Sequence, residues 1–382
     1  MSTPGFSFQE TARDGDARCG TVVTTRATIE TPVFMPVGTQ ASVKSQTPAE
    51  VAANGARIIL ANTYHLWLRP GAERVDTMGG VQKFMSWPHA MLTDSGGYQV
   101  FSLTKLRKMD DHGVTFRSHL TGEQKLLTPE ESMRVQALLR SDIAMVLDEC
   151  PPGAAPRPVI EAAMTRTSAW ARRSLATPAA EGQARFGIVQ GGTHLDLRLR
   201  HLDDIASLGV DGVALGGFSV GEPIAEMYRV LAELAPAMPR ERPRYLMGVG
   251  TPYDLLAAIG NGIDMFDCVL PTRNARNGQA LTWHGRVNLR QARHTLDSAP
   301  LDARCGCPVC ATFTRSYLRH LFNAKEMLGP RLVTEHNLWF YGELTRAARV
   351  AIREGRYQSF AREAVQAMRD GDEVKTQGTE AS

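Results

Sequence analysis

The sequence predicts an α/β fold, built as an irregular (β/α)8 barrel. Eight short apolar runs recur over about 240 residues, and each is followed by a turn and a helical pattern. Buried parallel strands have continuous apolar runs, and strand–helix alternation indicates βαβ units. An open, doubly wound sheet is the alternative. The eight runs are Val33 to Val37, Ile58 to Ala61, Ala90 to Thr93, Ile143 to Leu147, Phe186 to Val189, Gly212 to Leu215, Arg244 to Met247 and Ile263 to Phe266.

Three helix starts between these runs share one pattern, in which Thr-Pro is followed two residues later by an acid. The Thr hydroxyl can cap free N–H groups, Pro fits the first helical position, and the acid favours the helix dipole. The three are Thr47-Pro48-Ala49-Glu50, Thr128-Pro129-Glu130-Glu131 and Thr251-Pro252-Tyr253-Asp254.

Three excursions decorate the predicted barrel, and each contains a turn typical of a β-hairpin. The first covers Phe6 to Ile29 and turns at Asp14-Gly15. The others cover Val114 to Leu127, around Thr121-Gly122, and Gln279 to Leu289, around His284-Gly285.

The composition favours a globular protein of the cytoplasm. Of the 382 residues 43% are hydrophobic and 22% charged, which is ordinary for a chain that buries a core. No apolar run approaches the roughly 18 residues of a membrane span, so no membrane association is expected. The polar N-terminus, Met1 to Gly20, lacks the apolar segment of a signal peptide.

Charge is distributed unevenly along the chain. Between Cys268 and Thr334 ten Lys and Arg residues face three acids, a net charge of +7 in a chain whose total is +3. The remainder therefore carries −4. A basic region on an otherwise acidic protein suits a polyanionic partner, although a solvated basic face without a partner is the alternative.

Polar residues and glycines close most of the apolar runs. In a (β/α)8 barrel such positions converge on the C-terminal mouth, where active sites lie. A single Asp there is more often a helix cap, but a cluster of carboxylates beside an apolar core is costly without a function. The closing residues are Asn62, Asp94, Asp148, Gln190, Gly216-Gly217, Gly248 and Asp267.

This set suits chemistry on a glycosidic bond to a flat base. Of two carboxylates flanking such a bond, one can attack the anomeric carbon while the other transfers protons. A neighbouring Asp and Gln offer the acceptors and donors that read a purine edge. Tyr98 and Met247 could sandwich a ring, although each is by default an ordinary core residue. A metallohydrolase would need more histidines than His65 and His194 near strand ends.

The cysteines indicate a metal site rather than disulfides. Three of the six, Cys305, Cys307 and Cys310, form a Cys-x-Cys-x2-Cys cluster. Three thiolates and one imidazole make a closed, structural Cys3His zinc site. His336 and His320 compete for the fourth position.

These features divide the chain into four expected units. Residues 1–293 form the catalytic barrel with its N-terminal hairpin, and residues 294–340 a zinc-binding subdomain. Residues 341–370 form closing helices, and residues 371–382 a disordered tail.

Several segments, in the same order along the chain from about Phe6 to Ala367, resemble the bacterial tRNA-guanine transglycosylase (queuine tRNA-ribosyltransferase) family. The segments are Asp94-Ser95-Gly96-Gly97-Tyr98-Gln99, Gln190-Gly191-Gly192, Tyr245-Leu246-Met247-Gly248-Val249-Gly250, Met265-Phe266-Asp267-Cys268-Val269-Leu270-Pro271-Thr272-Arg273 and Thr334-Glu335-His336-Asn337.

The resemblance implies an enzyme that exchanges the guanine at the wobble position of G-U-N anticodons by double displacement. Asp267 matches the nucleophile that attacks ribose C1′ and holds the tRNA covalently. Asp94 matches the general acid/base. Arg273 and Arg276 match residues that grip the anticodon loop.

The resemblance also implies the binding residues. Asp148, Gln190 and the Gly217 amide match the base-recognition groups, with Tyr98 and Met247 as the stacking pair. Cys305, Cys307, Cys310 and His336 match the ligands of one structural zinc per chain, which favours His336 over His320. Members of this type are homodimers without an organic cofactor.

The pocket floor implies the incoming base. Cys150 and Val220 resemble the bacterial enzymes that insert 7-aminomethyl-7-deazaguanine in place of guanine. After Gly217 the family pattern is Leu-Ala-Val-Gly, whereas this chain has Phe218-Ser219-Val220-Gly221. Phe218 is expected to supply the backbone carbonyl that the family's Leu offers to the base.

Two alternatives from other classes remain open. A non-catalytic RNA-binding scaffold would use the zinc cluster and the basic stretch, but would leave the carboxylates without a role. A nucleoside N-glycosidase would use the carboxylates but would not explain the basic stretch.

Overall fold

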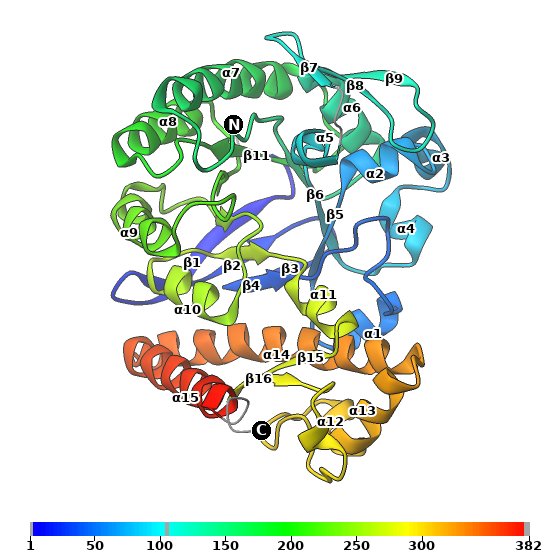
Figure 1. Ribbon diagram of the computed structural model, residues 1–382. Coiled ribbons are helices and arrows are strands. Elements are labelled where there is room, and N and C mark those ends of the chain that lie inside the picture. Colours follow the sequence, from blue (N-terminus) through cyan, green and yellow to red (C-terminus); the bar gives the residue numbers. More distant parts are fainter. Residues whose placement is uncertain (1–2, 104–106, 378–382) are drawn as a thin grey trace.

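The computed structural model describes residues 3–103 and 107–377, and its centre is one eight-stranded parallel sheet (Figure 1). The strand order is β4-β14-β13-β12-β11-β10-β6-β5. Its members are β4 (Val33–Met35), β5 (Ile58–Ala61), β6 (Ala90–Thr93), β10 (Ile143–Met145), β11 (Ala184–Val189), β12 (Gly212–Leu215), β13 (Arg244–Leu246) and β14 (Met265–Asp267).

The two outer strands of this order, β4 and β5, meet and bring the sheet to near closure. Val37 forms a parallel bridge with Leu60, and the Gly38 amide donates to the Leu60 carbonyl at 2.6 Å. The Leu60 amide donates in turn to the Pro36 carbonyl at 3.0 Å. The predicted (β/α)8 barrel is therefore confirmed, and the open sheet is not formed.

All eight predicted runs become barrel strands, but several end at other residues. The run from Val33 ends as a strand at Met35, because Pro36 has no N–H to donate to the ladder. The run from Ile263 pairs only over Met265–Asp267, so the strand includes Asp267 itself. An apolar run in the sequence indicates which residues are buried, and burial extends further along the chain than the hydrogen-bonded pairing of the strand. The predicted runs are therefore longer than the strands.

Helices follow the strands and cover the barrel (Figure 1). Thr47 and Thr251 both form capping boxes, with Glu50 and Asp254 respectively, and Thr128 caps its helix through the Glu131 amide. The helices are α1 (Pro48–Ala53), α2 (Thr63–Leu68), α3 (Ala72–Thr77), α4 (Val81–Met85), α5 (Gly97–Leu103), α6 (Pro129–Leu139), α7 (Arg157–Ala176), α8 (Leu195–Ser207), α9 (Ile224–Leu234), α10 (Pro252–Gly260) and α11 (Leu270–Arg276).

The N-terminal segment forms a three-stranded antiparallel sheet of β1 (Ser7–Asp14), β2 (Ala17–Val23) and β3 (Thr28–Thr31). This confirms the first predicted hairpin. Phe6, directly before β1, packs on the barrel: its ring meets the ring of Phe186 in β11 edge-on, with ring centroids 5.8 Å apart.

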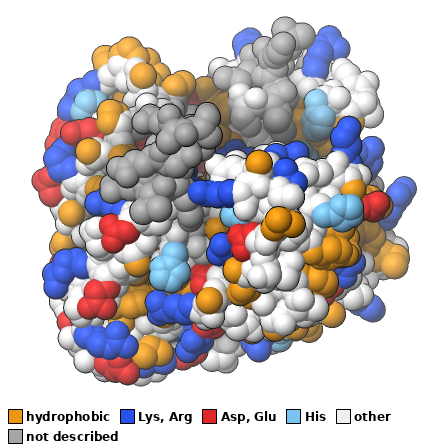
Figure 2. Space-filling view, turned by 60° about the horizontal axis from the view of Figure 1, so that its bottom comes forward, with side chains coloured by type: hydrophobic (Ala, Val, Ile, Leu, Met, Phe, Trp, Pro, Cys, Tyr) orange, Lys and Arg blue, Asp and Glu red, His pale blue; other side chains and the backbone are white. Residues whose placement is uncertain are grey.

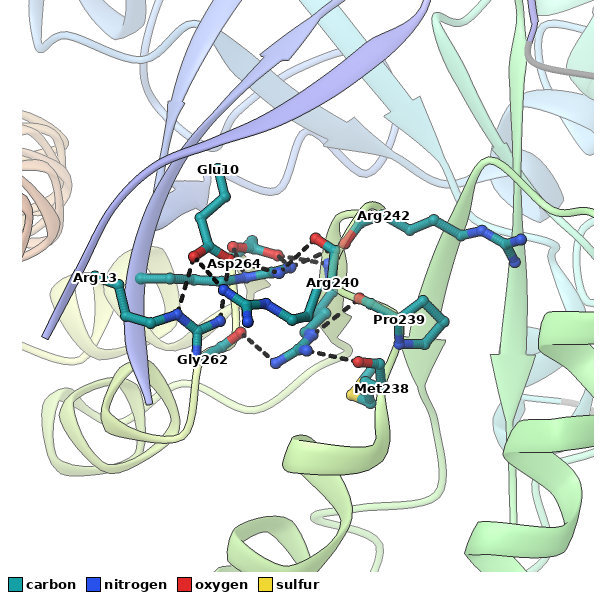
Figure 3. A network of polar contacts seen from close by, with 10 residues as sticks. Glu10, Arg13, Met238, Pro239, Arg240, Arg242, Gly262 and Asp264 are labelled. Carbon is teal, nitrogen blue, oxygen red and sulfur yellow. Dashed lines mark hydrogen bonds and ion pairs between the residues drawn. The ribbon is translucent and has the colours of Figure 1, made fainter. Parts of the chain in front are cut away.

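A network of polar contacts ties this sheet to the amino-terminal ends of β13 and β14 (Figure 3). The buried Arg18 donates from Nε and Nη2 to the two carboxylate oxygens of Asp264, at 3.0 and 2.5 Å. Its guanidinium also donates to the carbonyls of Arg240 and Arg242, both at 2.8 Å. The amide of Arg244 donates to Asp264 at 2.7 Å. These contacts thereby attach the N-terminal sheet to this end of the barrel.

The two other predicted hairpins are also confirmed. β8 (Val114–Arg117) pairs with β9 (Gln124–Leu127), and β7 (Arg107–Met109) adds a third strand. β15 (Gln279–Thr282) pairs with β16 (Gly285–Asn288).

The C-terminal part consists of α12 (Pro308–Thr312), α13 (Arg315–Asn323), α14 (Leu328–Arg353) and α15 (Tyr357–Gln377), with short 3-10 turns at Ala235–Ala237 and Ala292–His294 elsewhere. Figure 1 shows α14 running between the barrel and the unit formed by β15, β16, α12 and α13. That unit has an apolar core of its own, which includes Val309, Leu318 and Leu321.

The expected division of the chain at residue 340 falls inside α14, which continues from the metal-binding unit into the closing helices. Residues 371–377 of the expected tail belong to α15, and residues 378–382 lie outside the described residues. The four-unit division stays a prediction. Among the described residues, none of the helices has the length and apolarity that crossing a membrane requires.

Candidate active site

The polar residues that close the apolar runs gather at the carboxyl-terminal mouth of the barrel. Asp94 follows β6 directly, Asp148 follows β10 after two more residues, and Asp267 ends β14. The charge of Asp267 helps to raise the pKa of Asp94, and that of Asp94 helps to raise the pKa of Asp148. The three predicted carboxylates therefore lie within electrostatic range of one another.

Asp94 accepts hydrogen bonds on both carboxylate oxygens. Oδ1 accepts from the Thr63 and Gly96 amides at 2.8 and 3.2 Å. Oδ2 accepts from Gln99 Nε2 at 2.8 Å and from the side-chain amide of Asn62. Burial raises the pKa of Asp94 to about 6, and these hydrogen bonds limit the rise. A carboxyl group with such a pKa can both give and take a proton near neutrality.

Asp267 is held through one oxygen only. Its Oδ1 accepts from the Tyr245 hydroxyl at 2.6 Å and from the Gly248 amide at 2.8 Å. Among the described residues, Oδ2 accepts no hydrogen bond. Burial raises the pKa of Asp267, and the two donors act against that rise. The pKa of Tyr245 lies well above its ordinary value because of burial and the nearby Asp267, so the phenol remains a donor. One fixed and one free oxygen suit a nucleophile.

Asp148 and Gln190 form a hydrogen-bonded pair in the interior of the mouth. Gln190 Nε2 donates to Asp148 Oδ2 at 2.7 Å, and Ser95 Oγ donates to Oδ1 at 3.4 Å. Burial is the main cause that raises the pKa of Asp148 to about 6. The buried Gln190 Oε1 has no hydrogen-bond partner among the described residues. An unsatisfied buried acceptor is rare in folded proteins and often marks a ligand site.

Gly216 and Gly217 lie against this pair. A Cβ at Gly217 would stand 2.3 Å from Gln190 Oε1, and one at Gly216 would stand 2.7 Å from Gln190 Nε2. Gly217 also has a φ of +68°, which L side chains rarely adopt. A side chain at either position would therefore displace the Gln190 amide, and at Gly217 the backbone conformation also favours glycine.

The other predicted pocket residues have mixed surroundings. Tyr98, on α5, is 55% exposed, so it is not an ordinary core residue, whereas Met247 is half-buried against the barrel core. Burial raises the pKa of Cys150 to about 12, so this group is a neutral thiol. Val220 is half-buried, and its amide donates to Glu222 at 3.0 Å. Phe218 is buried, with the Arg198 guanidinium 3.8 Å from its ring centroid.

Sequence reasoning missed most of the residues that hold these groups. Asn62 stood out as a strand-ending residue but had no partner assigned, and Gln99 and Tyr245 lay in quoted segments without a role. No spacing rule relates Tyr245 to Asp267, because the two meet only where β13 and β14 lie side by side. Arg198 carried no signal in the sequence.

Arg273 and Arg276 are exposed on α11, the short helix that begins three residues after Asp267. Two exposed positive charges therefore lie close in sequence to Asp267, the carboxylate with the free oxygen.

Cys305, Cys307, Cys310 and His336 come together as a metal-binding cluster. Their ligand atoms all lie within 4.8 Å of one another. His336 Nδ1 is 3.7, 3.5 and 3.3 Å from the three sulfur atoms in that order. The other ring nitrogen, Nε2, lies 2.9 Å from the Leu281 carbonyl, a contact that orients the imidazole. His320 lies elsewhere, beside Tyr317 on α13.

Comparisons with known proteins agree with this geometry. Residues 14–370 match the family model "Queuine tRNA-ribosyltransferase". A protein of Sorangium cellulosum with that name is 61% identical over 94% of this chain and 91% of its own length. Relatives of the same name from Novosphingobium aromaticivorans and Zymomonas mobilis are 54% and 51% identical, over 93% and 94% of this chain and 96% and 95% of their own lengths. The chain therefore belongs to the queuine tRNA-ribosyltransferase family.

Proposed function

We propose that this chain exchanges the wobble guanine of G-U-N tRNAs for 7-aminomethyl-7-deazaguanine, with a covalent intermediate between Asp267 and the ribose. The observation that carries the proposal is the unequal bonding of two carboxylates at one mouth. Asp267 leaves one oxygen free, whereas Asp94 is fully hydrogen-bonded and has a pKa of about 6. The family membership supports the same reaction.

In the first displacement, the free Asp267 oxygen attacks ribose C1′ while the bond from C1′ to guanine N9 breaks. Guanine leaves with that electron pair and receives a proton from Asp94. In the second displacement, the ionised Asp94 takes the N9 proton of the incoming base, and N9 attacks C1′. The ester bond breaks, and its electrons return to the Asp267 carboxylate. Two inversions retain the anomeric configuration.

Asp148, Gln190 and the Gly217 amide are the groups that we assign to base recognition, with Tyr98 and Met247 on the two ring faces. The Asp148 carboxylate can accept from the N–H groups of a guanine edge, and an amide N–H can donate to its carbonyl. Cys150 and Val220 border the pocket that receives the base, and Phe218 contributes its backbone carbonyl there. The unsatisfied Gln190 Oε1 supports a polar ligand at this place.

tRNA is the proposed partner, gripped by Arg273 and Arg276. Figure 2 supports a polyanion surface: among the charged side chains, Lys and Arg are more frequent than Asp and Glu on the half that corresponds to the side of α12 and α13 in Figure 1. Acidic and basic side chains mix on the other half.

Zinc is the metal that fits the Cys3His cluster. A tetrahedral zinc with bonds of about 2.3 Å to sulfur and about 2.0–2.1 Å to nitrogen would place these atoms roughly 3.6 Å apart. The sulfur–nitrogen distances of 3.3–3.7 Å agree with that value. Four protein ligands leave no open position, so the metal would be structural and would take no part in the base exchange.

Metal analysis of the purified chain should find one zinc per chain, and chelation should lower the melting temperature. A folded chain without metal would contradict the assignment.

A homodimer completes the proposal. Apolar side chains are exposed on α13 and at the start of α14, where Tyr317 is 40%, Met327 87% and Leu328 38% exposed. Phe313 stacks on Tyr317 with ring centroids 5.5 Å apart and extends this surface. Sedimentation should give twice the chain mass, and Tyr317→Asp should shift it towards the monomer.

The reaction is tested by incorporation of labelled guanine into unmodified tRNA with a G-U-N anticodon, without any nucleotide. Uptake at the first anticodon base would support base exchange. Tight tRNA binding without uptake would favour the RNA-binding scaffold. Release of guanine without replacement would favour the nucleoside N-glycosidase.

A further inference from the structure

Arg198 is a fully buried arginine directly behind the mouth of the barrel. It lies in the first turns of α8, and its side chain reaches back to the carboxyl ends of β11 and β12. This direction follows from helix geometry, because side chains lean towards the helix N-terminus. Arg198 thus lies where the chain leaves both the Gln190 segment and the Gly216-Gly217 segment.

The guanidinium donates four hydrogen bonds, all to backbone carbonyls. Nε donates to Gly192 at 2.8 Å, and Nη1 donates to Val189 at 3.1 Å and to Gly216 at 2.8 Å. Nη2 donates to Gly217 at 3.3 Å. Two of the acceptors flank Gln190 along the chain, and the other two are Gly216 and Gly217.

No carboxylate pairs with Arg198 within the described part of the chain. Arg18, another fully buried arginine, has Asp264 as a bidentate partner. An unpaired buried cation is costly, and here carbonyl dipoles and the Phe218 ring offset its charge.

The hydrogen bond to Gly216 determines where the next amide points. The Gly216–Gly217 peptide bond is trans, so its C=O and N–H point in opposite directions. Because the C=O is held by Arg198, the Gly217 N–H points away from Arg198. On that side lies Cys150, in the region assigned to the base, and the Gly217 backbone acts against the rise in the pKa of its thiol.

Without this hold, two consecutive glycines could rotate their shared peptide at little cost. Rotation would replace a donor by an acceptor at the pocket. Guanine and 7-aminomethyl-7-deazaguanine share O6 as an acceptor on the edge distant from the ribose, whereas only guanine has N7. The Gly217 donor therefore suits O6.

We propose that Arg198 is a positioning residue for base recognition, which holds the Gly216 and Gly217 carbonyls so that the Gly217 amide faces O6 of the bound base. The inference rests on the proposed base exchange. The inference also assigns a role to Phe218, because the Phe218 ring covers the Arg198 guanidinium.

The test compares guanine with 6-thioguanine, which keeps the N1 proton but offers a weakly accepting sulfur in place of O6. Both bases are measured as competing substrates for uptake into unmodified tRNA by the wild type, Arg198→Met and Arg198→Lys. The matched control is Arg200→Met, since Arg200 lies on the same helix with its side chain 59% exposed. Melting temperature and covalent tRNA trapping are measured for every variant.

We expect the wild-type preference for guanine to fall about tenfold in both Arg198 variants, since a lysine cannot reach four carbonyls at once. The Arg200→Met preference should stay at the wild-type value, and trapping should persist in all variants. Equal weakening of both bases, or no change, would overturn the proposal and leave Arg198 a structural residue. Failure of both Arg198 variants to fold would overturn it as well. If the wild type does not take up guanine at all, the proposed reaction itself fails, which is a distinct result.

Discussion

Asp264 lies just before β14 and Asp267 lies at its end, three residues further along the chain, and their surroundings are opposite. At the amino-terminal end, both oxygens of Asp264 are bound by the buried Arg18, and the Arg244 amide adds a further donor (Figure 3). At the carboxyl-terminal end, Asp267 has one oxygen bound by Tyr245 and Gly248, and no described cation within ion-pair distance. The fully buried Asp264 is paired with a cation, and the half-buried Asp267 is not.

The difference shows that Asp264 serves stability and Asp267 serves chemistry, although the two lie three residues apart. A buried carboxylate paired with a bidentate arginine contributes to stability, because removal of either partner leaves the other charge buried and unpaired. A buried carboxylate without a cation destabilises the folded chain but stays reactive. In a (β/α)8 barrel these tasks fall to opposite ends of the strands.

The largest expected effect is the loss of chemistry in Asp267→Asn. Because the amide is not nucleophilic, base exchange should fall by about 10⁴-fold or more. Covalently trapped tRNA should disappear from a denaturing gel. Asp264→Asn is the matched control, because its folded fraction should still trap tRNA. Persistence of trapping in Asp267→Asn would remove Asp267 from the nucleophile's role.

Asp264→Asn should have the next largest effect, on stability. The substitution leaves the buried Arg18 with only Glu10 as an ion-pair partner, 3.5 Å from Nη1, so the free energy of unfolding should fall by about 3–5 kcal/mol. Denaturant titration measures this change. Arg18→Met combined with Asp264→Asn should recover part of the loss, since both charges are then absent. A loss below about 1 kcal/mol in the single variant would show that the pair contributes little.

The pH dependence should come next. Burial raises the pKa values of Asp94 and Asp148 to about 6, so both carboxyls become protonated as the pH falls through 6. A protonated Asp94 cannot take the N9 proton, and a protonated Asp148 is a poorer acceptor. kcat/KM for guanine should therefore fall at least tenfold per pH unit below about pH 6. A flat profile from pH 5 to 7, with an unchanged melting temperature, would contradict these assignments.

The smallest effect should be a gain of stability in Asp148→Asn. The folded-state pKa of Asp148 is raised, so the ionised form is disfavoured by folding above about pH 6, and the protonated form carries no such penalty. Asparagine keeps an acceptor for Gln190 and removes the charge. We expect about 1–2 kcal/mol more stability at pH 7.5, a gain that shrinks as the pH falls towards 4. A loss of stability in Asp148→Asn at pH 7.5 would contradict the conclusion that burial of the ionised Asp148 destabilises the folded chain.

Much of the fold followed from local patterns. All eight barrel strands were predicted as apolar runs, and the Thr-Pro starts at Thr47 and Thr251 formed capping boxes. Strand ends were predicted less well, because an apolar run shows burial whereas a strand ends where its hydrogen-bond partner ends. The run from Ile143, for example, remains buried to Leu147, but its strand ends at Met145.

The metal centre shows what a sequence leaves open. The cysteine spacing indicated metal, but His320 competed with His336 for the fourth position until the family resemblance favoured His336. In the structure His336 faces the three sulfur atoms from α14, and its second ring nitrogen contacts the Leu281 carbonyl. Leu281 belongs to the β15–β16 hairpin, so no local signal could identify this contact.

By itself the sequence determined the alternation of strands and helices, the carboxylates that follow the strands, and the family. These features depend on neighbouring residues, whose spacing and polarity can be read directly. The tertiary structure alone decided which carboxylate gains a cation, which oxygen of Asp267 stays free, and that Arg198 holds the glycines of the pocket. Those features arise where segments distant in sequence meet, and the low dielectric of the interior gives each such contact its effect on charge and reactivity.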